Sequence, residues 1–514
     1  MKNAINHEIS QALLDHMNLM LHREIAANKD IRPLNDKLCR NNKLLNSVKE
    51  AIEKSGLKDG MTISFHHHFR NGDYIVNMVM EQIAQMGIKN LRIASSSLSA
   101  VHAPLIEHIK NGVITRIETS GMRGELAEAI SHGLMEEPVV FRSHGGRAAA
   151  IANGKLHIDV AFLGTASADV LGNASGIYTN PEGKSICGSL GYAKVDARYA
   201  SKTIILTDNV VKYPNLPAAI EATDVDYVVK VDAVGDSSKI SSGATRFTKN
   251  PRDLLIAEAA ATVIEHSGFF NDGFSIQTGS GGAALAVTRF ITEEMEARNI
   301  KARYALGGIT AQIVNLHKEG LIEKILDVQS FDTVAAESLR DDQEHVEIDG
   351  CLYASSFNEG SAIHQLDIVI LSALEVDINF NVNVLTGSDG VIRGAIGGHP
   401  DTAGKAALTV LVAPLIRGRI PCIMDKVNTL VTPGTVCDVL VTDMGIAVNP
   451  NRPEIKERLI NAGIEITTIE KLQEIATKIV GIPEPLKFTD KIVGIVTHPD
   501  GTVLDVIHEV KDVD

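Results

Sequence analysis

A run of three histidines, His66 to His68, stands directly before Arg70 and the turn-forming pair Asn71-Gly72 in the stretch FHHHFRNGD. Imidazole and guanidinium groups next to a glycine turn could bind a metal ion or an anion. Consecutive strand residues point to opposite faces, so the three histidines cannot all turn inward on one metal ion. One face of the run, either the outer two histidines or His67 alone, could instead meet an anion together with Arg70.

Four further segments place small residues at the predicted carboxyl ends of strands. They are Ser95-Ser96-Ser97, Gly279-Ser280-Gly281-Gly282, Gly307-Gly308-Ile309-Thr310 and Gly394-Ala395-Ile396-Gly397-Gly398-His399. Ligands bind at this edge of open α/β sheets, where glycine lets the backbone approach and helix N-termini present N–H groups. One glycine turn is usually only a tight turn, and TGSGGAA alone favours that structural role. Several turns together could stabilise an oxyanion through backbone donors.

Three polar side chains elsewhere leave alternatives open. Arg246 lies in SGATRFTKNP, a loop before a predicted helix, and is either an anion partner or a solvated surface arginine. Asn381 and Asn383 alternate with apolar residues in NFNVNV, so both face one side of an extended segment. Each asparagine either fixes a loop or binds substrate.

Several catalytic motif classes are absent or incomplete. The glycines of TGSGG lack the third glycine spacing of a dinucleotide fingerprint. GGHPDTAGKA resembles a P-loop, but five residues separate Gly398 from Gly404, and Ala406 stands where Ser or Thr should hold magnesium. Neither a G-x-S-x-G elbow nor an H-E-x-x-H helix occurs. We therefore reject NAD chemistry and nucleotide hydrolysis, and we predict no metal site.

The elements that must position these residues follow a repeated pattern. From about residue 60, β-branched runs (MTISFHH, NLRIAS, VITRIETS, HIDVAFLG) alternate with amphipathic helical segments. The same order recurs with GFSIQTG, ARYALGG, LIEKILDVQS and QLDIVILS. Gly112 and Gly320 lie 208 positions apart, and so do Asp159 and Asp367. We therefore predict an α/β protein of two doubly wound units related by internal duplication.

The expected organisation has three parts: a helical N-terminal extension over 1–60, a first α/β domain over 61–240 and a second over 241–514. The second begins after a Gly/Ser/Thr-rich junction, with Pro251 in the first turn of a predicted helix. The stretch KIVGIVTHPDGTVLDVIHEV near the C-terminus predicts a β-hairpin around Pro499-Asp500-Gly501.

Composition limits the partners. The net charge is −15, and no Lys/Arg-rich run with aromatics occurs, so we expect no nucleic acid partner. No signal peptide and no uncharged run long enough to cross a bilayer is found, so we expect no membrane partner. Five scattered cysteines without C-x-x-C spacing suit a reducing cytoplasm. An acidic protein that binds an anion needs local donors, such as helix N-termini and a few arginines.

Taken together, these residues resemble the citrate CoA-transferase family, the alpha subunits of citrate lyase. The resemblance runs from about Lys43 to the C-terminus and is strongest in DGMTISFHHHFRNGDYIVNMVM, ASSSLSAVHAPLIEHI, VGDSSKISSGATR, QTGSGGAALAVTRF, ALGGITAQIV, NVNVLTGSDGVIRGAIGGHPDTA and LVTDMGIAVNPNRP. It implies two tandem CoA-transferase-like domains of the NagB/RpiA type, in agreement with the repeat.

The resemblance also implies an activity and partners. Members exchange the acetyl group of an acyl-carrier thioester for citrate, which gives citryl-thioester and acetate. They work in a cytoplasmic complex with a lyase beta subunit and an acyl-carrier gamma subunit, and we expect a homo-oligomer. The gamma subunit carries the CoA-like phosphoribosyl-dephospho-CoA prosthetic group, so no cofactor is expected in this chain.

One departure from better-known CoA-transferases concerns mechanism. Those enzymes use a strand-end glutamate as nucleophile, whereas the corresponding stretch here, YALGGITAQ, has no carboxylate. This fits a route through a mixed acetyl–citrate anhydride, in which the citrate carboxylate itself is the nucleophile. Glu359 and Glu375 are the nearest acidic alternatives, and neither is marked as activated.

Roles follow from this resemblance. Gly397, Gly398, Ser280, Gly281 and Gly282 would form the oxyanion hole. Citrate would be held by Ser95, Ser96, Ser97, Gly307, Gly308, Thr310 and Arg246, with Asn381, Asn383 and His399. The acyl donor would contact His67, Arg70, Asn71 and Gly72.

Two other functions are considered. A sugar-phosphate isomerase on the same α/β unit would need a single unit with a carboxylate base, and the duplication argues against it. A non-catalytic scaffold or ligand-sensing subunit would also lack the glutamate, so the sequence does not separate it from an enzyme.

Overall fold

The computed structural model describes residues 7–17, 42–177, 186–241, 248–279 and 281–511. The chain divides into two compact units, Met1–Arg40 and Asn41–Asp514. The described part of the first unit contains helix α1 (Gln11–His16), which begins where the Ser10 side chain accepts a hydrogen bond from the Leu13 N–H. The functional residues all belong to the second unit.

Most strands in the first half of the unit Asn41–Asp514 belong to one ten-stranded sheet. Its order is β1-β11-β9-β6-β2-β3-β4-β5-β25-β26, and all neighbours pair in parallel except β25 with β26. The strands are β1 (Leu44–Leu45), β2 (Thr62–Phe65), β3 (Leu91–Ser95), β4 (Ile114–Thr119), β5 (Val139–Phe141), β6 (Val160–Thr165), β9 (Lys202–Thr207), β11 (Tyr227–Lys230), β25 (Phe488–Thr497) and β26 (Val503–Val510). Its helices are α2 (Val48–Ser55), α3 (Ile75–Gln85), α4 (Leu105–Lys110), α5 (Glu125–Ser131), α6 (His144–Ala152) and α7 (Gly191–Tyr199).

An eight-stranded sheet carries the second half, in the order β15-β14-β13-β12-β16-β19-β23-β24. The strands are β12 (Phe274–Thr278), β13 (Ala302–Ile309), β14 (Ile325–Ser330), β15 (His345–Glu347), β16 (Ile368–Ser372), β19 (Leu408–Val412), β23 (Val439–Thr442) and β24 (Gly445–Val448). Its helices are α8 (Pro251–His266), α9 (Gly282–Arg298), α10 (Ala311–Lys318), α11 (Thr333–Asp341), α12 (Gly350–Ala354), α13 (His399–Ala403), α14 (Pro453–Asn461) and α15 (Ile469–Val480).

Short strands extend from the two large sheets. One small sheet contains β7 (Ser167–Asp169), β8 (Ala174–Ser175) and β10 (Val210–Val211), and another contains β17 (Glu375–Asp377), β18 (Val382–Asn383) and β22 (Ile423–Met424). The pair β20 (Ile416–Arg417) and β21 (Ile420–Pro421) forms a separate ribbon. The predicted α/β fold with parallel sheets is therefore confirmed.

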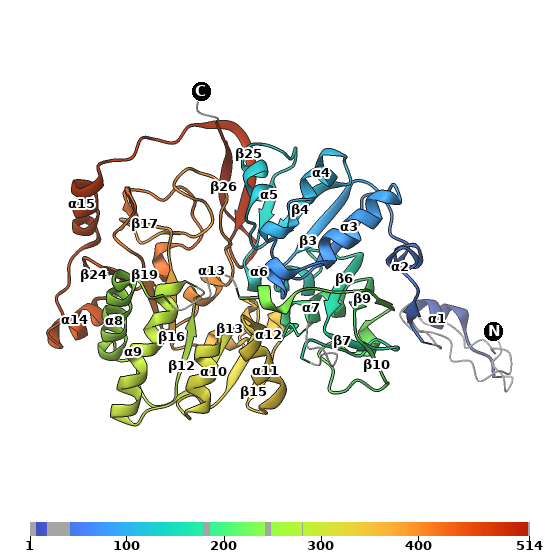
Figure 1. Cartoon of the computed structure of the whole chain (residues 1–514), viewed down its shortest axis with the longest axis horizontal. Coiled ribbons are helices and arrows are strands. Elements are labelled where there is room, and N and C mark those ends of the chain that lie inside the picture. The colour runs from blue at the N-terminus through green and yellow to red at the C-terminus, as the bar shows by residue number, and fades with distance from the viewer. Residues whose placement is uncertain (1–6, 18–41, 178–185, 242–247, 280, 512–514) are drawn as a thin grey trace. The chain divides into compact units, whose positions relative to one another are not determined.

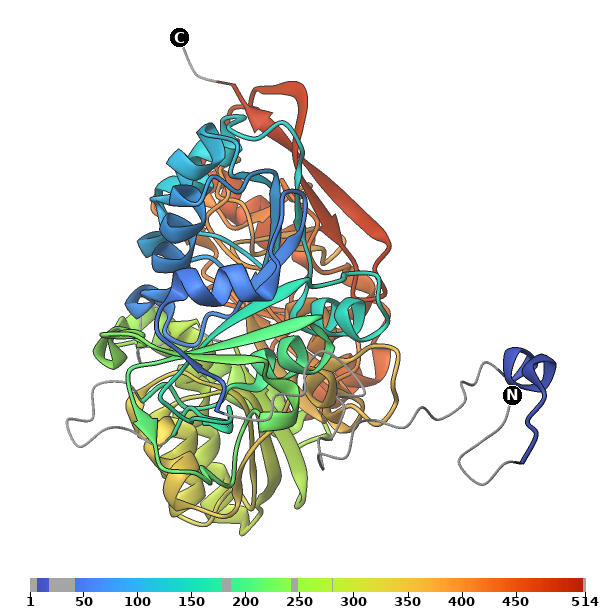
Figure 2. The same cartoon turned by 90° about the vertical axis from the view of Figure 1, so that its right-hand side faces the viewer.

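The predicted C-terminal hairpin is present as β25 and β26, but it belongs to the first sheet and not to the predicted second domain. Figure 1 and Figure 2 show this red hairpin beside the blue and teal elements of the first half. Gly494 of β25 pairs in parallel with Val139 of β5, so the last two strands extend the first sheet. The predicted boundary near residue 241 lies between the two sheets, yet the tail of the predicted second domain returns to the first.

The hydrophobic core explains why both sheets belong to one unit. Helices α6 and α7 of the first half pack with α12 of the second (Figure 1). Leu385 and Ile396 are buried in the core of the first sheet, whereas Tyr192 of α7 is buried with the residues of the second. Each half therefore completes the core of the other, which fixes the strand ends of both sheets relative to one another. No helix in the described ranges is long and apolar enough to cross a membrane.

Candidate functional site

A cavity of about 760 Å³ lies where the carboxyl ends of strands from both sheets meet. His67 follows β2, Arg123 follows β4, Gly281 lies between β12 and α9, and Gly282 is the first residue of α9. Parallel strands bring their carboxyl ends to one edge of a sheet, which is where such folds bind ligands. The predicted location of the site is therefore the location of the cavity.

The cavity concentrates positive charge in an acidic protein. Five arginines line it, namely Arg70, Arg123, Arg252, Arg393 and Arg417. Among its described lining residues the single carboxylate is that of Asp253, which accepts a hydrogen bond from Thr248 Oγ1 at 2.9 Å. Against a net charge of −15 for the chain, this excess of guanidinium groups favours an anionic ligand.

His67 presents a ring nitrogen to the cavity. Its backbone N–H donates to Ser96 Oγ at 3.1 Å, and its Nδ1 lies 2.6 Å from the same oxygen. Burial lowers the pKa of His67 well below its usual range. A neutral imidazole therefore faces the ligand space.

The other two histidines of the run lie elsewhere. β2 ends at Phe65, and the rings of His66 and His68 are tilted by 41° to each other with centroids 3.6 Å apart. Both side chains are buried and neither lines the cavity. The alternation predicted for the run therefore selects His67 alone.

Arg70 is held in a strained backbone conformation beside His67. Its φ is 53°, a left-handed value that few residues other than glycine adopt. Its guanidinium carbon lies 4.1 Å from the centre of the Phe331 ring, close enough for a cation–π contact. Burial lowers the pKa of Arg70 to about 10, so the side chain remains charged at neutral pH.

The glycine turns supply backbone donors. Gly397 has a φ of 58°, and within the described residues neither its N–H nor that of Gly398 has a hydrogen-bond partner. A Cβ on Gly398 would lie 2.3 Å from the Tyr353 hydroxyl oxygen, and a Cβ on Gly281 would lie 2.0 Å from Ser372 Oγ. Both positions therefore require glycine, and α9 begins beside them without a side-chain cap.

A buried carboxylate joins the Gly397 turn to the first half of the unit. Asp401 Oδ1 accepts from Ser143 Oγ at 2.7 Å, and its Oδ2 accepts from the Gly145 N–H at 2.9 Å. The His144 N–H donates to the Gly397 carbonyl at 2.8 Å. Burial raises the pKa of Asp401 to about 7. The N-terminus of α6 is thereby fastened to α13.

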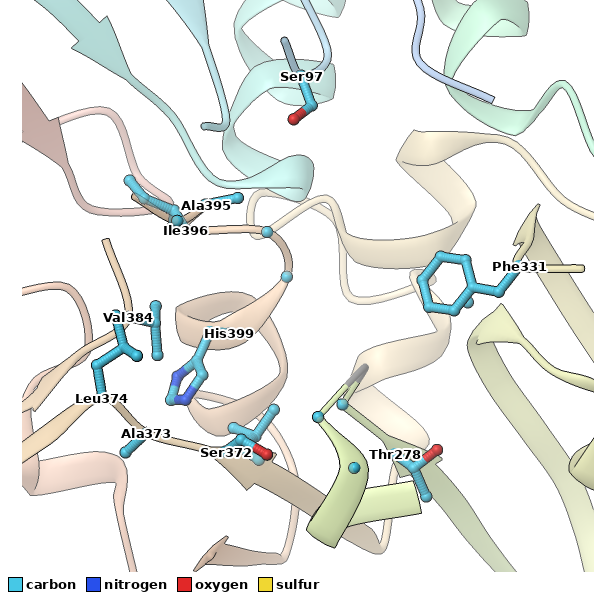
Figure 3. A pocket seen from close by; sticks show the side chains of 18 of the residues that line it. Ser97, Thr278, Phe331, Ser372, Ala373, Leu374, Val384, Ala395, Ile396 and His399 are labelled. Atoms are coloured by element: carbon cyan, nitrogen blue, oxygen red, sulfur yellow. The ribbon is translucent and has the colours of Figure 1, made fainter. Parts of the chain in front are cut away.

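One part of the cavity wall is apolar. Figure 3 shows Ala373, Leu374 and Val384 gathered near the ring of His399, with Ser97 and Phe331 on other sides of the cavity. His399 Nδ1 lies 2.7 Å from Thr432 Oγ1, whereas its buried Nε2 has no hydrogen-bond partner within the described residues. Burial lowers the pKa of His399 to about 4.

The structure brings ten of the predicted site residues together around the cavity. These are His67, Arg70, Asn71, Ser97, Gly281, Gly282, Gly308, Gly397, Gly398 and His399. Seven others do not line it, namely Gly72, Ser95, Ser96, Gly307, Thr310, Asn381 and Asn383. Arg246 and Ser280 lie outside the described residues.

The residues that miss the cavity have structural roles. Asn383 Nδ2 donates to Glu375 Oε2 at 2.8 Å, and Asn381 Nδ2 donates to Asp377 Oδ2 at 3.1 Å. Both asparagines therefore fix loops, and their predicted role as citrate contacts is corrected, because neither lines the cavity. Ser95 Oγ donates to the Ser97 carbonyl, Ser96 supports His67, and Thr310 begins α10. Gly72 packs against the Asp236 carbonyl, which a Cβ would approach to 2.2 Å.

Glu375 is not placed to act as a nucleophile. Its carboxylate accepts hydrogen bonds from Asn383 Nδ2 and from the backbone and side-chain nitrogens of Asn428, the last at 2.6 Å. Glu375 is buried, which raises its pKa, and it does not line the cavity. Glu359 is exposed outside it.

Four of the five cavity arginines were not predicted from the sequence. Arg123 follows β4, Arg252 lies in the first turn of α8, and Arg417 belongs to the short strand β20. Arg393 ends the stretch GSDGVIR before the Gly394 turn. Only the position of Arg393 beside a predicted glycine turn offered a local signal. The others reach the cavity through packing between distant segments.

Comparisons with known proteins agree on one family. The model of the family "Citrate lyase, alpha subunit (CitF)" matches residues 41–510. The chain is 59% identical over 473 residues to the citrate lyase alpha chain of Escherichia coli strain K12, covering 92% of each protein. It superposes with a TM-score of 0.90 on a crystal structure described as the citrate lyase alpha subunit of Streptococcus mutans in complex with citrate. That pair is 56% identical, over 95% of this chain and 96% of the other.

A more distant solved structure shares the fold alone. The malonate decarboxylase alpha subunit of Acinetobacter baumannii superposes with a TM-score of 0.64 at 14% identity, over 86% of this chain and 93% of the other.

Proposed function

This chain belongs to the family of citrate lyase alpha subunits, and we propose that it exchanges the acetyl group of an acyl thioester for citrate. The products would be citryl-thioester and acetate. One observation carries the proposal: five guanidinium groups and one carboxylate line a cavity at the strand ends of an acidic chain. Citrate carries three carboxylates near neutral pH, so such a cavity suits it.

The reaction needs no covalent enzyme intermediate. A citrate carboxylate oxygen attacks the acetyl thioester carbonyl, the C–S bond breaks, and a mixed anhydride and a thiolate form. The thiolate then attacks the citryl carbonyl of the anhydride, the C–O bond breaks, and acetate leaves. Both steps pass through an oxyanion, for which the N–H groups of Gly397 and Gly398, without a partner among the described residues, are suited donors.

The protein contributes positioning and charge. Arg70 and its neighbours neutralise the carboxylates of citrate, which would otherwise repel the thiolate. His67 adds a neutral imidazole. The carboxylate of Glu375 is held by Asn383 and Asn428 and is not placed to attack the thioester, which supports the anhydride route.

The natural donor would be the acetylated prosthetic group of an acyl-carrier gamma subunit, with a lyase beta subunit as the next enzyme. The name of the family implies other subunits. The prosthetic group, phosphoribosyl-dephospho-CoA, is then a substrate brought by a partner.

A duplicated NagB/RpiA-type unit is part of the same proposal. The strand orders β5-β4-β3-β2-β6-β9-β11 and β15-β14-β13-β12-β16-β19-β23 correspond one to one. Asp159 accepts from the Thr62 N–H at 2.7 Å, and Asp367, 208 positions later, accepts from the Ser275 N–H at 2.8 Å. Equal topology and equivalent hydrogen bonds in the two halves support an internal repeat.

The test is an exchange assay on the purified chain. With acetyl-CoA as donor, citrate should give citryl-CoA and acetate in equal amounts, and omission of citrate should abolish acetate release. Citrate binding by calorimetry without any exchange would favour the alternative of a ligand-sensing scaffold.

A further inference from the structure

The cavity has two ends of different chemistry. We define the basic end as His67, Arg70, Asn71 and Arg123, and the apolar end as Ala373, Leu374, Val384 and His399, with Arg417 beside it. All nine residues line the cavity. The basic end follows β2 and β4 of the first sheet, whereas at the apolar end Ala373 and Leu374 follow β16 of the second sheet, Val384 follows β18, and His399 begins α13. Figure 3 shows the apolar group together, apart from Ser97 and Phe331.

The basic end offers charge and donors. The positive charge of Arg123 is close enough to contribute to the lowered pKa of Arg70, although burial is the main cause. The hydroxyls of Ser97 and Ser120 donate to the carbonyls of Gly121 and Ser96, so they keep only acceptor capacity. The guanidinium groups and the Asn71 amide therefore supply the donors that a polycarboxylate needs.

The apolar end offers a wall with one unused polar atom. His399 is 7% exposed, and its Nε2 has no hydrogen-bond partner within the described part of the chain. The carbonyl of Ala373 accepts from Arg417 Nη2 at 3.3 Å, and the Leu374 N–H donates to the Asn383 carbonyl at 3.0 Å. Arg417 is exposed, so its charge lies at the outer side of this wall.

Each end of the cavity suits one of the two substrates. A tricarboxylate at the apolar wall would lose its hydrating water and gain only a contact with the neutral imidazole of His399. This exchange is unfavourable. A pantetheine-type arm consists mainly of methylene groups with two amides and a terminal phosphate, so it can use an apolar wall, one polar atom and an outer cation.

Resting on the proposed function, we propose that the apolar end binds the arm of the acyl thioester. The ring of His399 lies against the arm, and Arg417 meets its phosphate. Citrate occupies the basic end. The sequence-based assignment gave His67 and Arg70 to the donor, and this proposal reverses it.

The test uses two variants that each remove one guanidinium from the same cavity. Arg70→Gln should raise the KM for citrate about tenfold and leave that for acetyl-CoA within about twofold. Arg417→Gln should do the reverse. Arg70→Lys keeps the positive charge. Comparing it with Arg70→Gln shows whether the KM for citrate changes because the charge is lost or because the strained turn is disturbed. Effects exchanged between the two substrates, or equal for both, would overturn the proposal.

A third variant tests the wall without changing charge. Val384→Phe should narrow the apolar end, raise the KM for acetyl-CoA about tenfold and leave citrate binding by calorimetry unchanged. Free pantetheine should compete with acetyl-CoA and not with citrate, and Arg417→Gln should not weaken it because it lacks the phosphate. Competition of pantetheine with citrate would overturn the proposal. If the wild-type chain shows no exchange at all, the proposed function is refuted. Citrate binding by calorimetry to the same variants would still show which end of the cavity holds citrate.

Discussion

The buried carboxylate of Asp401 gives a stability prediction with a defined pH window. Its pKa in the folded protein is about 7, above the ordinary aspartate value of 3.8, because burial disfavours the charged form. The folded state therefore binds more protons than the unfolded state between these values. Stability should fall as pH rises through this window and should change little from Asp401 above about pH 7.

The magnitude follows from the size of the window. One pKa unit corresponds to about 1.4 kcal/mol, so the interval from pH 5 to pH 7 should cost the wild-type protein about 3 kcal/mol. Asp401→Asn removes the titration. Its amide oxygen can still accept from the Gly145 N–H, and its amide nitrogen can donate to Ser143 Oγ. Relative to wild type, the variant should gain about 3 kcal/mol between pH 5 and pH 8.

Scanning calorimetry of both proteins at several pH values is the assay. For a cooperative unit the length of Asn41–Asp514, an unfolding entropy of about 1 kcal/mol/K converts this gain into about 3 °C. Ser143→Ala removes a hydrogen bond that favours the ionised form, so its window should move to higher pH. A melting-temperature difference between wild type and Asp401→Asn that stays constant from pH 5 to pH 8 would refute the reasoning.

Three further predictions concern catalysis. Gly398→Ala should lower kcat at least about tenfold with little change in the KM for citrate, since its Cβ would lie 2.3 Å from the Tyr353 hydroxyl oxygen and displace the donor turn; an unchanged kcat would remove Gly398 from the oxyanion site. Phe331→Ala should raise the KM for citrate about threefold to tenfold, because the ring 4.1 Å from the Arg70 guanidinium carbon fixes that side chain, and steady-state kinetics with varied citrate would measure it. Incubation with acetyl-CoA and hydroxylamine should leave Glu375 unmodified by peptide mass spectrometry, because its carboxylate is held by Asn383 and Asn428; a hydroxamate there would establish a covalent route.

The regular elements were predictable because their signals are local. The strand expected in MTISFHH follows from β-branched residues and is present as β2, although it ends at Phe65, before the histidines. The partner of β25 was not predictable. Its pattern predicts a strand, but its pairing with β5 joins Gly494 to Val139, and no local property of either segment encodes that choice.

The site, too, contains residues that local signals predicted and residues that they did not. The turns at Gly281 and Gly397 were predictable because glycine at a strand end has few other uses. The roles of Asn381 and Asn383 were not, because a buried asparagine has the same sequence signature whether it holds a loop or a ligand. Arg252 and Arg417 were missed because packing between distant segments, rather than spacing, brings them to the cavity.

The equivalent strand ends of the two halves carry different residues, and this difference suits a reaction with two unlike substrates. In the first half β2 is followed by His67 and Arg70, which supply a neutral imidazole and a cation. In the second half β12 is followed by Gly281 and Gly282, which open an uncapped helix N-terminus. A cation holds a carboxylate before and after reaction, whereas backbone N–H groups favour charge that appears only in the transition state. Two identical strand ends would provide one of these functions twice. Under the proposed function, this difference would let one cavity bind the nucleophile and stabilise the oxyanion that it creates.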